Sequence, residues 1–101
     1  MGRMLETLTF GDFSGRVGEE FRLEGPSGAV SLKLVEVVDL ARRDNPGPRR
    51  PPFSLIFRGP QASVLPQRIW PLTHETLGRL EIFIVPIGPD ASGMQYEAVF
   101  T

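Results

Sequence analysis

Leu80-Glu-Ile-Phe-Ile-Val-Pro-Ile-Gly88 is the first arm of a predicted β-hairpin near the end of the chain. Pro89-Asp-Ala-Ser-Gly93 follows as a turn-forming cluster, and a second apolar run, Met94-Gln-Tyr-Glu-Ala-Val-Phe-Thr101, follows the turn. In the second run, one face holds Met94, Tyr96, Ala98 and Phe100, and the other holds Gln95, Glu97 and Thr101. This period-two alternation is typical of a strand with one buried and one wet face.

Length and composition bound the classes of protein to consider. The 101 residues predict a single domain over 1–101, and the net charge of −1 gives no general attraction to nucleic acid or anionic lipid. The sequence has no cysteine, which excludes disulfides and thiolate chemistry. It has no apolar run of membrane-spanning length, and residues 1–6 lack the apolar core of a signal peptide, so we expect a soluble, cytoplasmic protein.

A short helix is expected just after a frayed stretch over residues 1–7. Thr9 is a candidate N-cap, and Asp12 follows it at the spacing of a capping box. Gly11 and Gly15 within it keep the helix short, and we expect it to end by Gly18. The apolar residues on the helix face that would dock on the core are Phe10, Phe13 and Val17.

Two strands are predicted next, over residues 19–24 and 29–40, with the turn-forming Gly25-Pro-Ser-Gly28 between them. The apolar phase of the longer strand changes parity near Val35. Either a β-bulge there switches the faces and leaves Glu36 exposed, or both faces are covered and Glu36 points inward.

The second half completes a mainly all-β fold. Residues 41–52 are rich in Arg and Pro and are expected to form a mobile loop. Phe53 to Gly59 alternates as a strand with Ser54 outward, and a short strand over 68–73 contains Pro71, which places it at an edge or a bulge. We therefore predict a small antiparallel six-stranded barrel or roll with one short N-terminal helix, and leave barrel closure open.

The inventory of reactive residues is small. The single histidine, His74, is expected in a solvated turn, and a Ser-His-Asp triad would have to use it. Glu81 and Glu97 lie on the two arms of the hairpin, where they serve either as paired acid–base groups or as ordinary surface charges. The sequence contains no phosphate-binding glycine motif. We expect no catalytic residues, no metal ligands and no cofactor.

Two segments are candidates for binding a partner. The first is the Arg- and Pro-rich loop, with the candidate residues Arg42, Arg43, Arg49 and Arg50. It is a solvated loop, a proline-rich surface for a protein partner, or a phosphate-binding segment, and nucleic acid is disfavoured because no aromatics are interleaved with the arginines. The second is Trp70, which is either a partner anchor on an edge strand or part of the core.

The chain resembles a family of small bacterial proteins that is classed as a domain of unknown function. The resemblance is carried by Leu8-Thr9, Asp12-Phe13, Val17-Gly18, Phe21, Phe53–Pro60, Leu65–Gln67, His74, Leu77-Gly78, Phe83–Gly88 and Tyr96–Phe100. Residues 41–52 lie outside it, and Ile69-Trp70 stands where the family pattern has a Thr-Tyr-like pair. The resemblance implies genes with neighbours similar to phage tail-collar proteins, and it implies no catalytic residues.

Three classes of function follow as expectations. The leading one is a non-enzymatic protein-interaction module, accessory to a phage-tail-like or adhesin-like assembly. The alternative is a small-ligand-binding β-barrel, whose pocket would be lined by inward aromatics such as Phe57, Phe83 and Tyr96. An enzyme would need His74 beside a carboxylate in a concave site. A protein partner is expected, and nucleic acid and membranes are not.

Overall fold

The structure, a computed structural model, describes residues 8–25, 28–40, 52–60 and 64–100. Its elements are α1 (Phe10–Ser14), β1 (Glu20–Gly25), β2 (Gly28–Asp39), β3 (Phe53–Gly59), β4 (Arg68–His74), β5 (Gly78–Asp90) and β6 (Gly93–Phe100). Within the described ranges, no helix has the length and apolar character needed to cross a membrane.

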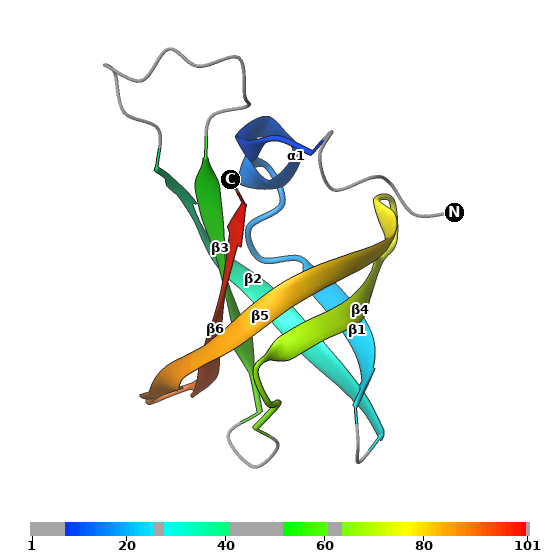
Figure 1. Cartoon of the computed structure of the whole chain (residues 1–101), viewed down its shortest axis with the longest axis vertical. Coiled ribbons are helices and arrows are strands. Elements are labelled where there is room, and N and C mark those ends of the chain that lie inside the picture. The colour runs from blue at the N-terminus through cyan, green and yellow to red at the C-terminus, as the bar shows by residue number, and fades with distance from the viewer. Residues whose placement is uncertain (1–7, 26–27, 41–51, 61–63, 101) are drawn as a thin grey trace.

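The six strands close into an antiparallel barrel in the order β1-β2-β3-β6-β5-β4 (Figure 1). The sequence left a barrel and a roll open, and the closed barrel is the observed form. Closure rests on β4 returning to β1, where the register shows one residue pair, Arg22 with Thr73. Extending this register places Glu24 level with Pro71, which has no N–H to donate to a ladder. The sparsest seam of the barrel therefore contains the proline that predicted an edge or a bulge.

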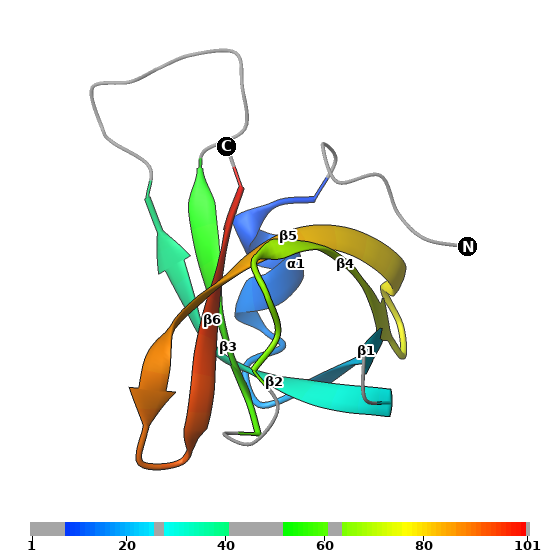
Figure 2. The ribbon, with the colours of Figure 1, turned by 60° about the horizontal axis from the view of Figure 1, so that its bottom comes forward.

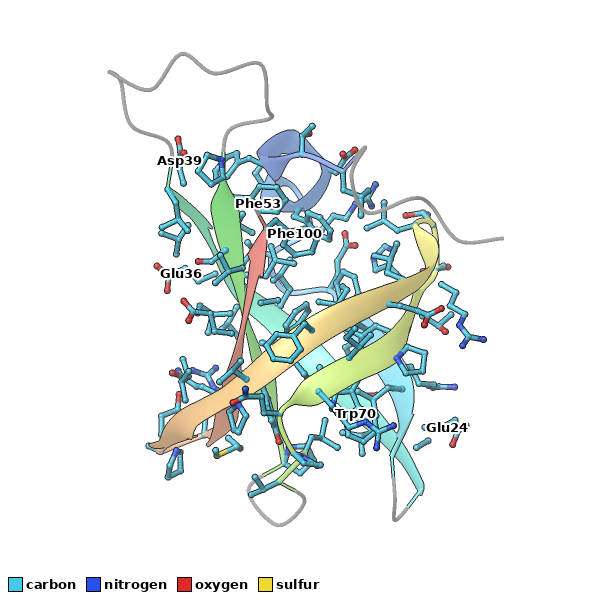
Figure 3. The ribbon with its side chains drawn as sticks, viewed as in Figure 1. Glu24, Glu36, Asp39, Phe53, Trp70 and Phe100 are labelled. Carbon is cyan, nitrogen blue, oxygen red and sulfur yellow. The ribbon has the colours of Figure 1, made fainter. Side chains whose placement is uncertain are left out.

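The predicted hairpin is present as β5 and β6, and its alternation sets the barrel interior. The side chains that β6 buries are Met94, Tyr96, Ala98 and Phe100, as the sequence predicts. In β2 the register with β3 shifts between Leu34 and Glu36, and Glu36 is exposed. These two observations confirm the bulge interpretation. The extra residue changes which parity of β2 faces the core, so the Glu36 carboxylate is not buried. In Figure 3, Glu36 points away from the barrel.

The helix α1 covers one end of the barrel. Thr9 N donates to Asp12 Oδ2 at 2.8 Å, which is the backbone half of the predicted capping box. Phe13 is fully buried, with its ring centroid 5.8 Å from that of Phe53 and 5.7 Å from that of Phe100. Figure 3 places Phe53 and Phe100 next to α1, and Figure 2, in which the bottom of Figure 1 comes forward, shows α1 behind β4 and β5.

The burial predictions for Val17 and Ser54 were wrong. Val17 is 51% exposed, because α1 ends at Ser14 and leaves Val17 beyond the helical face that docks on the core. Ser54 is buried although it was placed outward. Its cross-strand neighbours are Val38 on β2 and Val99 on β6, and these larger side chains flank the small hydroxymethyl group and shield it from water.

Replacing Phe13 with Ala should destabilise the protein by about 3–5 kcal/mol, because it removes a fully buried ring from the aromatic cluster. Val17→Ala is the matched control and should change stability by less than about 0.5 kcal/mol. The measurement is urea unfolding of the three proteins. Equal midpoints for Phe13→Ala and Val17→Ala would show that α1 does not hold the barrel end.

Candidate functional site

The indole of Trp70 lies inside the barrel. Trp70 is 3% exposed and belongs to the core, so the core interpretation is the one observed. Its Nε1 donates to the Pro66 carbonyl at 3.0 Å, and the Arg68 guanidinium lies 4.5 Å from the ring centroid. Figure 3 shows Trp70 near the start of β4, on the side of β1. A partner that approached this part of β4 from outside would contact Arg68 and Ile69 before it reached the indole.

The outer face of β4 and β5 carries two large apolar side chains opposite each other. Ile69 is 57% exposed and Phe83 is 49% exposed, and the two are cross-strand partners. We call them the Ile69–Phe83 pair. The prediction that Phe83 points inward was wrong, because Ile82 and Ile84 on either side take the inward positions of β5.

Phe83 was one wall of the predicted ligand pocket, and the structure does not bring that lining together. Phe57 and Tyr96 are fully buried in the core, and the Tyr96 hydroxyl accepts a hydrogen bond from Leu65 N at 2.9 Å. Phe83 lies on the other side of the barrel wall from them.

The prediction that His74 is a solvated turn residue was also wrong. His74 is the last residue of β4 and shares the inward parity of Trp70 and Leu72, so its ring enters the core and is 5% exposed. The imidazole centroid lies 4.6 Å from that of Phe21 on β1. Its Nε2 lies 2.6 Å from Oε1 of Glu19, the residue before β1. We call this arrangement the His74 clasp.

Hydrogen bonds fix which ring nitrogen of His74 carries the proton. Nδ1 accepts from the backbone N–H groups of Thr76 and Leu77, both at 3.1 Å, so Nδ1 is bare. Nε2 therefore carries the hydrogen and donates it to Glu19. Arg16 supports the carboxylate from 3.7 Å and also donates to Thr76 Oγ1 at 3.0 Å.

The His74 clasp contains a carboxylate, an imidazole and a hydroxyl, but they are not arranged for proton transfer. Thr76 Oγ1 lies 3.3 Å from Nδ1, the nitrogen whose lone pair already receives two backbone N–H groups. A general base must have a free lone pair directed at the nucleophile's proton. The clasp instead ties the β4–β5 turn to the start of β1.

The other chemical candidates stay apart. Glu81 lies opposite Pro71, whereas Glu97 lies between Ile56 and Val85, so the two carboxylates do not form a pair. In the described part of the chain, no group of three His, Asp or Glu residues could hold a metal ion. The partner-binding candidates Arg42, Arg43, Arg49 and Arg50 lie outside the described residues.

A second polar cluster, which the sequence analysis missed, fixes the tip of the β5–β6 hairpin. Asp90 Oδ2 accepts from Arg58 Nε at 3.0 Å, from Arg58 Nη2 at 2.6 Å and from Gln95 Nε2 at 2.8 Å. Its Oδ1 accepts from Ser92 N at 2.8 Å. The hydrogen bond from Arg58, followed by that from the Ser92 backbone, holds the pKa of Asp90 below its usual 3.8.

Comparison with known protein families matches residues 8–100 to a model described as a domain of unknown function, DUF6916. The match confirms the resemblance to a domain-of-unknown-function family. No curated protein and no solved structure matches the chain.

Replacing His74 with Ala should destabilise the protein by about 1–3 kcal/mol, because the Leu77 N–H then stays buried without its acceptor. The matched control is Glu75→Ala at the exposed neighbouring position, which should have little effect. Thermal unfolding compares the two variants. In parallel, ¹⁵N spectra of the imidazole at neutral pH should show a bare Nδ1 and a protonated Nε2, and the opposite tautomer would contradict the clasp.

The Asp90 cluster should stabilise the hairpin in a pH-dependent way. A carboxyl whose folded pKa is depressed contributes stability that is present above its unfolded value of 3.8 and is lost as the pH falls through the folded value. The difference in free energy of unfolding between wild type and Asp90→Asn should therefore shrink as the pH falls below 3.8. Glu81→Gln, at an exposed position, is the control. A pH-independent difference would contradict this role of Asp90.

Proposed function

We propose that the protein, which belongs to the DUF6916 family, works as a non-enzymatic protein-interaction module. The observation that carries the proposal is the exposed Ile69–Phe83 pair on the outer face of β4 and β5. Two large apolar side chains that face water together favour coverage by another protein, since burial of each contributes about 1.5–3 kcal/mol.

The immediate surroundings of the pair suit a protein contact. Pro71 on β4 and Val85 on β5 share its outward face, and both are half-buried. Cross-strand pairs of an aromatic and a β-branched residue hold each other in place, so little side-chain entropy is lost when a partner docks. The partner would bind the face of the sheet, because a closed barrel offers few unpaired strand edges for an added strand.

The proposal extends to the assembly and the compartment in which the module works. We propose a role as an accessory to a phage-tail-like or adhesin-like assembly, which rests on the phage tail-collar-like gene neighbours that the family resemblance implies. The module would be made and used in the cytoplasm, which suits a chain without cysteine. The Arg- and Pro-rich loop with Arg42, Arg43, Arg49 and Arg50 remains a second proposed contact.

The proposal is tested by recovering partners from a native lysate with the whole protein as bait. Wild type should return a protein at near-equal amount with and without nuclease. Phe83→Ser should lower that recovery about tenfold or more, because central apolar contacts carry most of the affinity of an interface. The control is Val17→Ser, which removes an equally exposed apolar side chain from the turn between α1 and β1.

Circular dichroism of each variant would confirm that its fold is kept. Recovery that depends on nucleic acid would contradict the proposal. Equal loss with Phe83→Ser and Val17→Ser, or with neither, would remove the Ile69–Phe83 pair as the contact.

A further inference from the structure

An open hollow of about 450 Å³ lies on the wall of the barrel formed by β2 and β3, beside the tip of the β5–β6 hairpin. It is lined by Ser31, Lys33, Arg58, Gly59, Pro60 and Ser92. Among the described residues, the lining contains two cations and two hydroxyls and no acidic residue. In chemical terms it offers hydrogen-bond donors and positive charge to whatever enters.

Lys33 and Arg58 are direct cross-strand partners on β2 and β3. Like charges placed opposite each other on a sheet repel; Asp90 compensates the charge of Arg58, and an anion between the two cations would compensate Lys33 as well. Lys33 is exposed and forms no ion pair with any described residue, although Glu20 is its neighbour on β1. Its ammonium is therefore available to a ligand.

Arg58 is held in place from behind. Its Nε and Nη2 both donate to Asp90, and Asp90 is held in turn by Gln95 and by the Ser92 backbone. The two N–H groups of Nη1 have no acceptor among the described residues. A guanidinium fixed by one carboxylate is already oriented for a second oxyanion, which lowers the entropy lost when that anion binds.

We propose that this hollow binds a carboxylate of an acidic peptide segment in the protein partner, a step that rests on the proposed interaction function. Lys33 and the free Nη1 of Arg58 contact the carboxylate oxygens, and the hydroxyls of Ser31 and Ser92 donate from the sides. The exposed ammonium of Lys33 and the half-buried guanidinium of Arg58 match one carboxylate. A nucleic acid would need a longer row of cations along its phosphates.

The hollow and the Ile69–Phe83 pair are independent surfaces. In the barrel order β1-β2-β3-β6-β5-β4, the strands of the hollow and the strands of the pair are not neighbours (Figure 1). A variant at one surface therefore leaves the other intact, and the two proposals can fail separately.

The sequence supplies its own reporter, because Lys33 is the single lysine. Reductive ¹³C-methylation of the full chain labels Lys33 and the α-amine only, and it keeps the positive charge. Titration with a short peptide of alternating Glu and Ser should shift the Lys33 methyl signal and leave the α-amine signal in place. The same peptide with Gln for Glu should shift neither. A Lys33 signal that does not move with the Glu peptide overturns the proposal.

Variants then test the site by fluorescence anisotropy with the labelled Glu/Ser peptide. Lys33→Gln should weaken binding about tenfold, Lys33→Arg should retain it, and Arg79→Gln, at an exposed arginine outside the hollow, should leave it unchanged. Added salt should weaken binding to wild type and have less effect on Lys33→Gln. Equal binding by wild type and Lys33→Gln would overturn the site.

Competition against the labelled peptide shows whether the hollow prefers a carboxylate or a phosphate. Inorganic phosphate or an oligonucleotide that displaces the peptide at a lower concentration than free glutamate does would assign the hollow to phosphate and overturn the carboxylate proposal. Recovery of partners from a lysate distinguishes failure of the carboxylate site from failure of the interaction function. If Lys33→Gln recovers the partner as wild type does while Phe83→Ser loses it, the interaction function stands and the carboxylate site falls.

Discussion

The packing of Phe13 against Phe53 and Phe100 is the contact on which the rest of the structure depends. The Phe53 and Phe100 rings are stacked, with centroids 4.8 Å apart, at the point where β3 begins and β6 ends. The pairing of β3 with β6 joins segments far apart in sequence, and closing such loops costs conformational entropy. Phe13 adds an apolar contact from α1 to both strands, so the helix, the strand pair and the barrel end stabilise one another.

Closure at the opposite seam depends on side chains more than on backbone. β1 and β4 share one residue pair, and Pro71 cannot extend the ladder. The His74 clasp lies at the same seam, because Glu19 precedes β1, His74 ends β4, and the imidazole packs on Phe21. The buried His74 thus has a structural role, because it joins two strands whose backbones pair at one residue position.

Local alternation predicted the architecture, and contacts between distant segments limited the prediction of sites. The parity of Met94 to Phe100 gave the inner face of β6 correctly, and the same parity rule puts Phe83 outside, next to the polar Glu81. His74 could likewise have been placed inward by its phase with Trp70 and Leu72. The Arg58–Asp90 contact spans 32 residues and depends on barrel register, which no local pattern contains.

In a barrel of this size, the inward side chains stabilise the fold, and the outward side chains are the ones that a partner can reach. Its inward positions are filled by apolar side chains, and the polar groups inside, such as the Tyr96 hydroxyl and His74, already have partners within the chain. Under the proposed interaction function, binding specificity comes from the outward positions, where substitution costs little stability. The Ile69–Phe83 pair and the Lys33–Arg58 pair are both cross-strand pairs on that outer surface, one apolar and one cationic. An interface that combines an apolar anchor with a charged contact gains affinity from the first and orientation from the second.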